Sequence, residues 1–152
     1  MPMVSEYLDS KGTSQPIDTP GVYKLIPAYI ADDQLTKKGD RMIRVCWESE
    51  DGQSVWDNLA ITDGAAFRWA QLWFGLGEQD TDFPSVSELA SACIRGLNNS
   101  IPVYAKVKLE PYKGKKVEYK GTKVPSIERF LDPEEGQALA ANAVNNNDEV
   151  PF

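Results

Sequence analysis

Alternating hydrophobic and polar positions predict three strands in the first half of the chain. The stretch Val22 to Ile30 is rich in β-branched and aromatic residues, as strands are. In Arg41 to Glu48, alternate positions through Trp47 fall on one face, which predicts a second strand with Trp47 in the core. The Asp51-Gly52 turn leads into a third strand over Gln53 to Leu59. Three consecutive antiparallel strands are therefore expected.

The pattern then changes to a helical period. Apolar residues recur at spacings of three and four from Ala65 to Gly77, which predicts an amphipathic helix. Its aromatic stripe is expected to pack in the core: Trp69, Trp73 and Phe74. A shorter helix is predicted from Ser85 to Gly96, where Ser85 and Glu88 form a capping box.

Strand periodicity returns after the helices. Ile101 to Glu110 alternates strictly, and Lys116 to Lys120 and Lys123 to Phe130 resemble returning strands. The order predicts a mostly β protein with one or two helices. It is typical of a five-stranded barrel of the oligonucleotide-binding (OB) type, with a helical insertion between strands three and four. The alternative is a small open sheet with two helices packed on one face.

The two ends of the chain are expected to lie outside this domain. Residues 1–20 contain Gly, Pro, Ser and Thr with little apolar periodicity, so they are predicted to form a flexible arm. Residues 21–131 would form the barrel, and residues 132–152 a disordered acidic tail. The low-complexity stretch Gln137 to Asn147 has too little apolar surface to offset its ordering entropy.

Composition changes the picture by removing classes of function. The 152 residues include no histidine, the commonest general base and metal ligand, so we expect no enzyme, metal site or cofactor. Carboxylate-only metal binding remains open, although acids in turns are usually solvated; the candidates are Asp32, Asp33, Asp80 and Asp82. We expect neither a membrane-spanning segment nor a signal peptide. Cys46 and Cys93 are expected to be buried thiols in a reducing compartment.

The net charge of −7 is unevenly distributed. Val103 to Pro125 holds seven lysines against two acids, whereas Asp132 to Phe152 holds five acids and no base. A basic module followed by an acidic tail is expected where one part binds a polyanion and the other stays free of it or competes with it.

The last hairpin supplies the first candidates for contacts with single-stranded nucleic acid. Single strands are held by basic groups along the phosphates and by aromatic rings on which bases stack. Both types interleave here: Tyr104, Lys106, Lys108, Tyr112, Lys113, Lys115, Lys116 and Tyr119. The alternative is a solubilising lysine-rich hairpin whose tyrosines pack over their neighbours.

A second wall is expected from the first two strands and their loop. The candidates there are Tyr23, Tyr29, Lys37, Lys38, Arg41, Arg44 and Trp47, of which Trp47 is assigned to the core. Trp56 has the opposite parity to its apolar neighbours, so it is predicted to be exposed on the binding face. No base-reading pattern is visible, so binding should tolerate any sequence.

The end of the chain has the chemistry of a docking peptide. Acids precede a rigid proline and a large aromatic, which suit a pocket with an apolar floor and a basic rim. The predicted partner-binding residues are Asp148, Glu149, Val150, Pro151 and Phe152. The alternative is an unselected, frayed end.

This tail resembles the C-terminus of bacterial and phage single-stranded-DNA-binding proteins, whose tip recruits replication and repair enzymes. Residues 20 to 130 instead resemble a phage family of unassigned function that is suspected of binding single strands. The resemblance rests on Gly21-Val22-Tyr23, Lys37-Lys38-Gly39-Asp40-Arg41-Met42, Val55-Trp56-Asp57-Asn58-Leu59 and the helix-like Ala65 to Gly77.

The resulting expectation is a non-enzymatic phage protein of the infected bacterial cytoplasm. It would coat exposed single-stranded DNA during phage DNA replication, recombination and repair, and its tail would recruit host or phage enzymes. The alternative is an adaptor or inhibitor that binds no nucleic acid and mimics such a tail to occupy a host protein's pocket. The sequence leaves open whether the protein is a homodimer and whether it prefers DNA to RNA.

Overall fold

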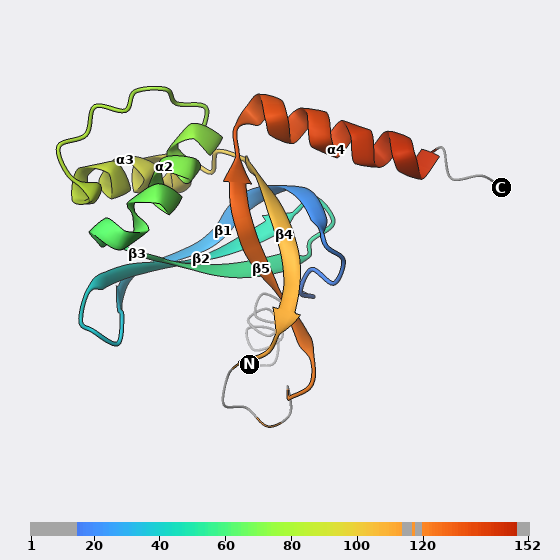
Figure 1. Cartoon of the computed structure of the whole chain (residues 1–152), viewed down its shortest axis with the longest axis horizontal. Helices are drawn as coiled ribbons and strands as arrows, with labels where there is room; N and C mark the ends of the chain where they lie inside the picture. Colours follow the sequence, from blue (N-terminus) through green and yellow to red (C-terminus); the bar gives the residue numbers. More distant parts are fainter. Residues whose placement is uncertain (1–14, 114–116, 118–119, 149–152) are drawn as a thin grey trace, which may run out of the picture.

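A computed structural model describes residues 15–113, 117 and 120–148 of the chain. The described residues form five antiparallel strands and three α-helices (Figure 1). The strands are β1 (Gly21–Leu35), β2 (Arg41–Ser49), β3 (Ser54–Ala60), β4 (Val103–Pro111) and β5 (Lys123–Leu131). The helices are α2 (Ala66–Gly75), α3 (Val86–Asn98) and α4 (Pro133–Asp148), and a single 3₁₀ turn, η1 (Asp63–Ala65), precedes α2. The prediction of a mostly β protein is confirmed.

The five strands form one sheet in the order β3-β2-β1-β4-β5. The central strand β1 pairs with β2 from Leu25 to Leu35 but with β4 only over Gly21 to Leu25. Two bulges interrupt the pairing of β1 with β2. The sheet curls strongly, so that its edge strands β3 and β5 approach each other, although no strand pairing joins them in the described part of the chain (Figure 1).

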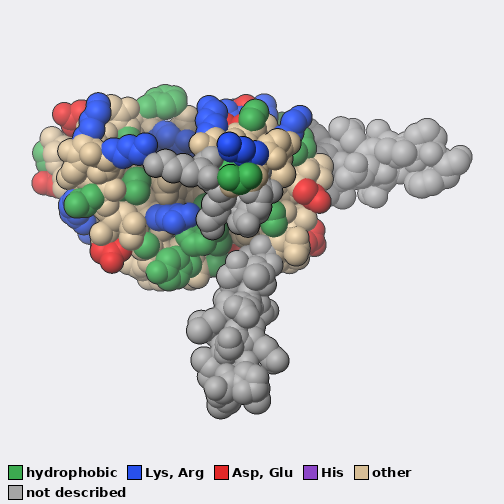
Figure 2. Space-filling view, turned by 90° about the horizontal axis from the view of Figure 1, so that it is seen from below, with side chains coloured by type: hydrophobic (Ala, Val, Ile, Leu, Met, Phe, Trp, Pro, Cys, Tyr) green, Lys and Arg blue, Asp and Glu red, His purple; other side chains and the backbone are tan. Residues whose placement is uncertain are grey.

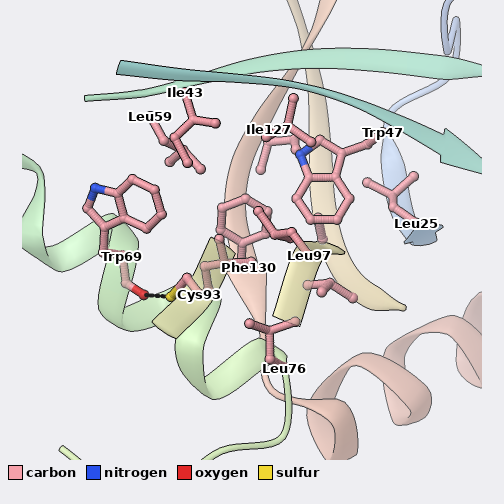
Figure 3. Packing of buried hydrophobic residues seen from close by; sticks show 14 of the residues in the cluster. Leu25, Ile43, Trp47, Leu59, Trp69, Leu76, Cys93, Leu97, Ile127 and Phe130 are labelled. Atoms are coloured by element: carbon pink, nitrogen blue, oxygen red, sulfur yellow. Dashed lines mark hydrogen bonds between the residues drawn. The ribbon is translucent and has the colours of Figure 1, made fainter. Parts of the chain in front are cut away.

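The core lies between the concave side of this sheet and helices α2 and α3 (Figure 3). Trp47 is fully buried, as its parity in β2 predicted, and its ring packs 5.6 Å from that of Phe130. Trp69 is also fully buried, and its indole N–H donates to the Ala60 carbonyl at 2.8 Å. Phe74 was expected in this core but is exposed at the surface of α2.

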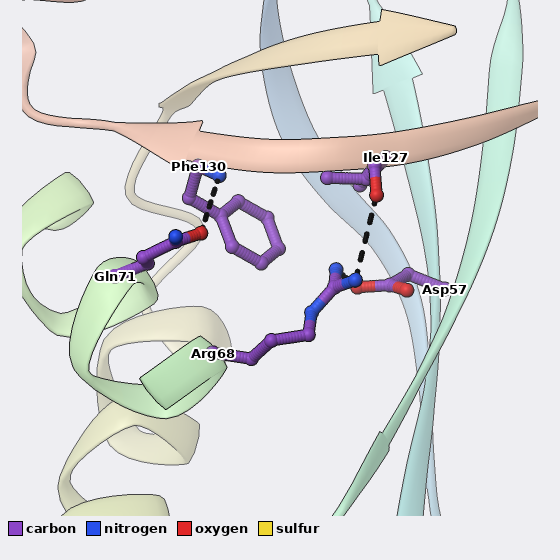
Figure 4. A network of polar contacts seen from close by, with 5 residues as sticks. All are labelled: Asp57, Arg68, Gln71, Ile127 and Phe130. Atoms are coloured by element: carbon purple, nitrogen blue, oxygen red, sulfur yellow. Dashed lines mark hydrogen bonds and ion pairs between the residues drawn. The ribbon is translucent and has the colours of Figure 1, made fainter. Parts of the chain in front are cut away.

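A side-chain connection from α2 spans the two edges of the sheet (Figure 4). The Arg68 guanidinium lies 2.7 Å from a carboxylate oxygen of Asp57 on β3 and donates to the Ile127 carbonyl of β5 at 3.4 Å. Its Cζ also lies 5.5 Å from the centre of the Phe130 ring. Arg68 therefore links β3 to β5 where the backbones are not paired.

The structure confirms a predicted helix cap but not the predicted end of the N-terminal arm. The Ser85 cap is confirmed, since its hydroxyl accepts from the Glu88 N–H at 3.3 Å. The prediction of a flexible arm over residues 1–20 is wrong for the end of this range. Ile17 is buried in the core, and its N–H donates to the Ser54 carbonyl. An apolar side chain and a bridge to the β3 edge anchor this segment even though it lacks periodicity.

The acidic segment after β5 is also different from the prediction, because residues 133–148 form α4. Its start carries standard helix signals that offset the low apolar content. The Asp132 side chain accepts from the Glu135 N–H at 2.9 Å, Pro133 occupies the first turn, and two acids follow there. Residues 149–152 of the predicted partner-binding tip lie outside the described residues, and Asp148 ends the helix.

Candidate nucleic-acid interface

An exposed group of three side chains lies on the outward face of β1, β2 and β3. Trp56 on β3 and Tyr29 on β1 are 45% and 59% exposed, and their ring centres lie 6.1 Å apart in an edge-to-face arrangement. The Arg44 guanidinium on β2 lies over the Trp56 ring at 4.5 Å. We call Tyr29, Arg44 and Trp56 the aromatic cluster. Two exposed rings with a cation stacked on one of them combine the surface and charge that single strands require.

Strand register explains why these residues meet. Cys46 pairs with Tyr29 on one side and with Trp56 on the other, so both rings stand on the same face of the sheet as its thiol. A bulge at Ala28 shifts the parity of β1 and turns Tyr29 toward this face. Cys46 is buried beneath the rings, and burial, followed by the Glu48 charge, raises its pKa. The buried Cys46 side chain therefore lies between the two strands whose rings form the cluster.

The loop between β1 and β2 adds exposed cations at the ends of the same strands. Lys37, Lys38 and Arg41 are all exposed, as a binding wall requires. The turn is fixed by a hydrogen bond from the Thr36 N–H to the Asp40 carbonyl at 2.8 Å and by Gly39, whose φ of 87° suits glycine. Figure 2 views the molecule from below the orientation of Figure 1: Lys and Arg side chains are spread over this face, with hydrophobic side chains among them.

The other two aromatic candidates for this wall make contacts within the protein. Trp47 is in the core. The Tyr23 hydroxyl donates to the Thr19 carbonyl at 2.6 Å, and burial is the main cause of its raised pKa. Tyr29 is thus the exposed tyrosine of β1.

The predicted hairpin residues lie on a different part of the sheet from the aromatic cluster. Tyr104, Lys106 and Lys108 lie on β4, which is separated from β2 and β3 by β1. Tyr104 is half-buried, because Gly136 in the first turn of α4 packs directly on its side chain. Lys106 forms an ion pair with Glu128 at 3.1 Å, and Lys108 lies 4.0 Å from Glu110. These residues are not brought together with the aromatic cluster.

The loop between β4 and β5 holds the remaining candidates. Lys113 is exposed and Tyr112 is half-buried, with its N–H donating to the Thr122 carbonyl at 3.0 Å. Three further predicted contacts lie outside the described residues: Lys115, Lys116 and Tyr119.

The sequence interpretation missed the environment of Asp57, which lies beside the cluster but on the inner face. Burial raises the pKa of Asp57 to about 6, and Arg68 lowers it less than burial raises it. The alternation of β3 already places Asp57 with Val55 and Leu59 on the core side, so the signal was present. A core-facing carboxylate needs a charged or hydrogen-bonding partner, and the half-buried Arg68 is that partner.

Comparison with known proteins adds no assignment: no model of a protein family matches the chain, and no curated protein is significantly similar to it. In the described ranges, no group of three or more Cys, Asp and Glu side chains could hold a metal ion. None of the described helices is both long and apolar enough to cross a membrane.

Proposed function

We propose that the protein binds single-stranded DNA across the outward face of β1, β2 and β3. The observation that carries this proposal is the aromatic cluster, because two large rings and a guanidinium have little structural reason to be exposed together. Each base stacked on an aromatic side chain contributes about 1–3 kcal/mol, and any base can stack. Lys37, Lys38 and Arg41 would contact the phosphates on either side.

The fold supports the same proposal. The described strands form an open sheet, and we propose that it is an OB-type barrel with an unpaired seam between β3 and β5. The strand order, the approach of β3 to β5 and the position of α2 between β3 and β4 in the chain support this proposal, and Arg68 would bridge the seam. In such barrels the face of strands two and three and the loops β1–β2 and β4–β5 bind oligonucleotides. In the proposed barrel, Arg44 and Trp56 would lie on that face, Tyr29 would lie beside it on β1, and Lys37 and Lys38 would lie in the β1–β2 loop.

The acidic tip is proposed to recruit replication, recombination or repair proteins of the phage or its host. Helix α4 spans 16 residues, or about 24 Å at the rise of an α-helix. It extends away from the sheet in Figure 1. The helix would therefore present the tip at a distance from the DNA-binding face, so that a partner and a strand could be bound together.

A titration of the full-length protein with labelled oligo-dT tests the binding proposal. We expect saturable binding that weakens with salt, and Trp56→Ala should weaken it about tenfold, since one stacked base is lost. Phe67→Ala is the matched control, because Phe67 is 73% exposed but lies on α2. Equal affinities for both variants would contradict the proposal.

The adaptor alternative has one favourable observation, which is that Lys106 and Lys108 each lie close to an acid. It predicts that the protein shows no saturable oligo-dT binding even at low salt. It also predicts that removing residues 148–152 abolishes binding to the host protein's pocket. The DNA-binding proposal instead expects DNA affinity to stay the same or rise after this removal.

A further inference from the structure

A hollow of about 290 Å³ adjoins the aromatic cluster at the bulge of β1. It is lined by Pro27, Ala28, Tyr29, Ile30, Leu97, Asn98 and Ser100. Tyr29 belongs to both features: its ring meets Trp56 edge to face, and the residue also lines the hollow. A base held in the hollow would therefore lie beside Tyr29 and next to the aromatic cluster.

One wall of the hollow is an unpaired strand edge. β1 pairs with β4 only as far as Leu25, and from Ile26 onward its described pairing is with β2 alone. The edge of β1 that faces α3 consequently has backbone donors and acceptors with no partner strand. The bulge at Ala28 adds a residue outside the regular ladder at this point.

The opposite wall comes from the end of α3 and carries polar side chains. Asn98 is exposed, and among the described residues its amide makes no side-chain hydrogen bond. Ser100 follows the cap of α3 with a φ of 57°, a left-handed conformation that glycine usually takes at this position. A serine held there has a conformational cost, and such local exceptions cluster at functional sites.

We propose that this hollow is a base-reading pocket that prefers adenine at one position of an otherwise sequence-tolerant strand. The inference rests on the proposed DNA binding. The base would stack on Tyr29, and the Asn98 amide would accept from N6 and donate to N7, the bidentate pairing that asparagine makes with adenine. The free edge of β1 and the Ser100 hydroxyl would hydrogen-bond the remaining edge.

The experiment places a single adenine at successive positions of oligo-dT, which avoids the self-stacking of oligo-dA. The full-length protein should bind one of these oligomers about fivefold or more tightly than oligo-dT, the scale of one good bidentate base contact. Replacing that adenine by 7-deazaadenine, which lacks the N7 acceptor, should remove most of the gain.

Two variants and one control locate the effect. Asn98→Ala should lose the adenine gain and keep its affinity and salt dependence for oligo-dT. Asn99→Ala is the control, because the neighbouring Asn99 caps α3 and does not line the hollow. Ser100→Gly should raise Tm by about 2–4 °C by relieving the left-handed serine, yet reduce the adenine gain.

The outcomes separate the pocket from the binding proposal. Oligo-dT binding without an adenine gain at any position, or a gain that persists in Asn98→Ala, would overturn the pocket and leave single-strand binding intact. Absence of binding to every oligomer would overturn both.

Discussion

Arg68→Met is expected to destabilise the fold by about 2 kcal/mol at neutral pH. Removing one partner of a fully buried ion pair costs about 3–5 kcal/mol, and the Arg68–Asp57 contact is short at 2.7 Å. The Arg68 side chain is 34% exposed, so solvent screens the pair and reduces this cost. Methionine keeps most of the packing of the arginine stem, which leaves the lost charge and the lost hydrogen bond to Ile127 as the main effects.

The loss should shrink in acid. Because the pKa of Asp57 is raised to about 6, its carboxyl is mostly protonated at about pH 4.5, and removing Arg68 then costs only hydrogen bonds, or about 1 kcal/mol. Urea denaturation followed by tryptophan fluorescence at both pH values measures the difference. Arg129→Met is the control, because the Arg129–Glu135 pair has side chains that are 45% and 41% exposed and should contribute less than about 1 kcal/mol. Equal losses for both variants, or a loss independent of pH, would refute the argument.

Three further predictions follow from buried groups. The folded-state pKa of Asp57 is about 6 against an ordinary 3.8, so the free energy of unfolding should fall as pH rises between these values. Asp57→Asn should abolish this dependence of stability on pH, and an unchanged dependence in urea titrations would disprove the prediction. Burial raises the pKa of Cys93 to about 12, and Cys46 is buried too, so a thiol reagent should label neither cysteine until the protein unfolds. Gly136→Ala would place a methyl group inside the Tyr104 side chain, so the start of α4 should lose hydrogen-exchange protection, and retained protection would contradict that packing.

The sequence predicted the features that depend on local periodicity. Alternation along β2 and β3 placed Trp47 inside and Trp56 outside, because successive side chains of a strand point to opposite faces. The Ser85 cap was predictable because it is also local: its hydrogen bond joins residues only three positions apart.

The features that were missed depend on interruptions or on distant contacts. Two bulges shift the parity of β1, so the pattern did not show that the strand continues to Leu35 or that Tyr29 joins Trp56. Tyr104 alternates with core residues and appeared exposed, but α4, which follows β5 in the chain, packs on it through Gly136. The pairing of Asp57 with Arg68 likewise requires the placement of α2 against both sheet edges.

Ultraviolet cross-linking of oligo-dT to the full-length protein, with adducts mapped by mass spectrometry, tests the central claim most directly. If the strand crosses the outward face of β1, β2 and β3, adducts should form at Tyr29 and Trp56. Adducts confined to Tyr104 on β4 or to Phe67 on α2, with none at the aromatic cluster, would contradict this account.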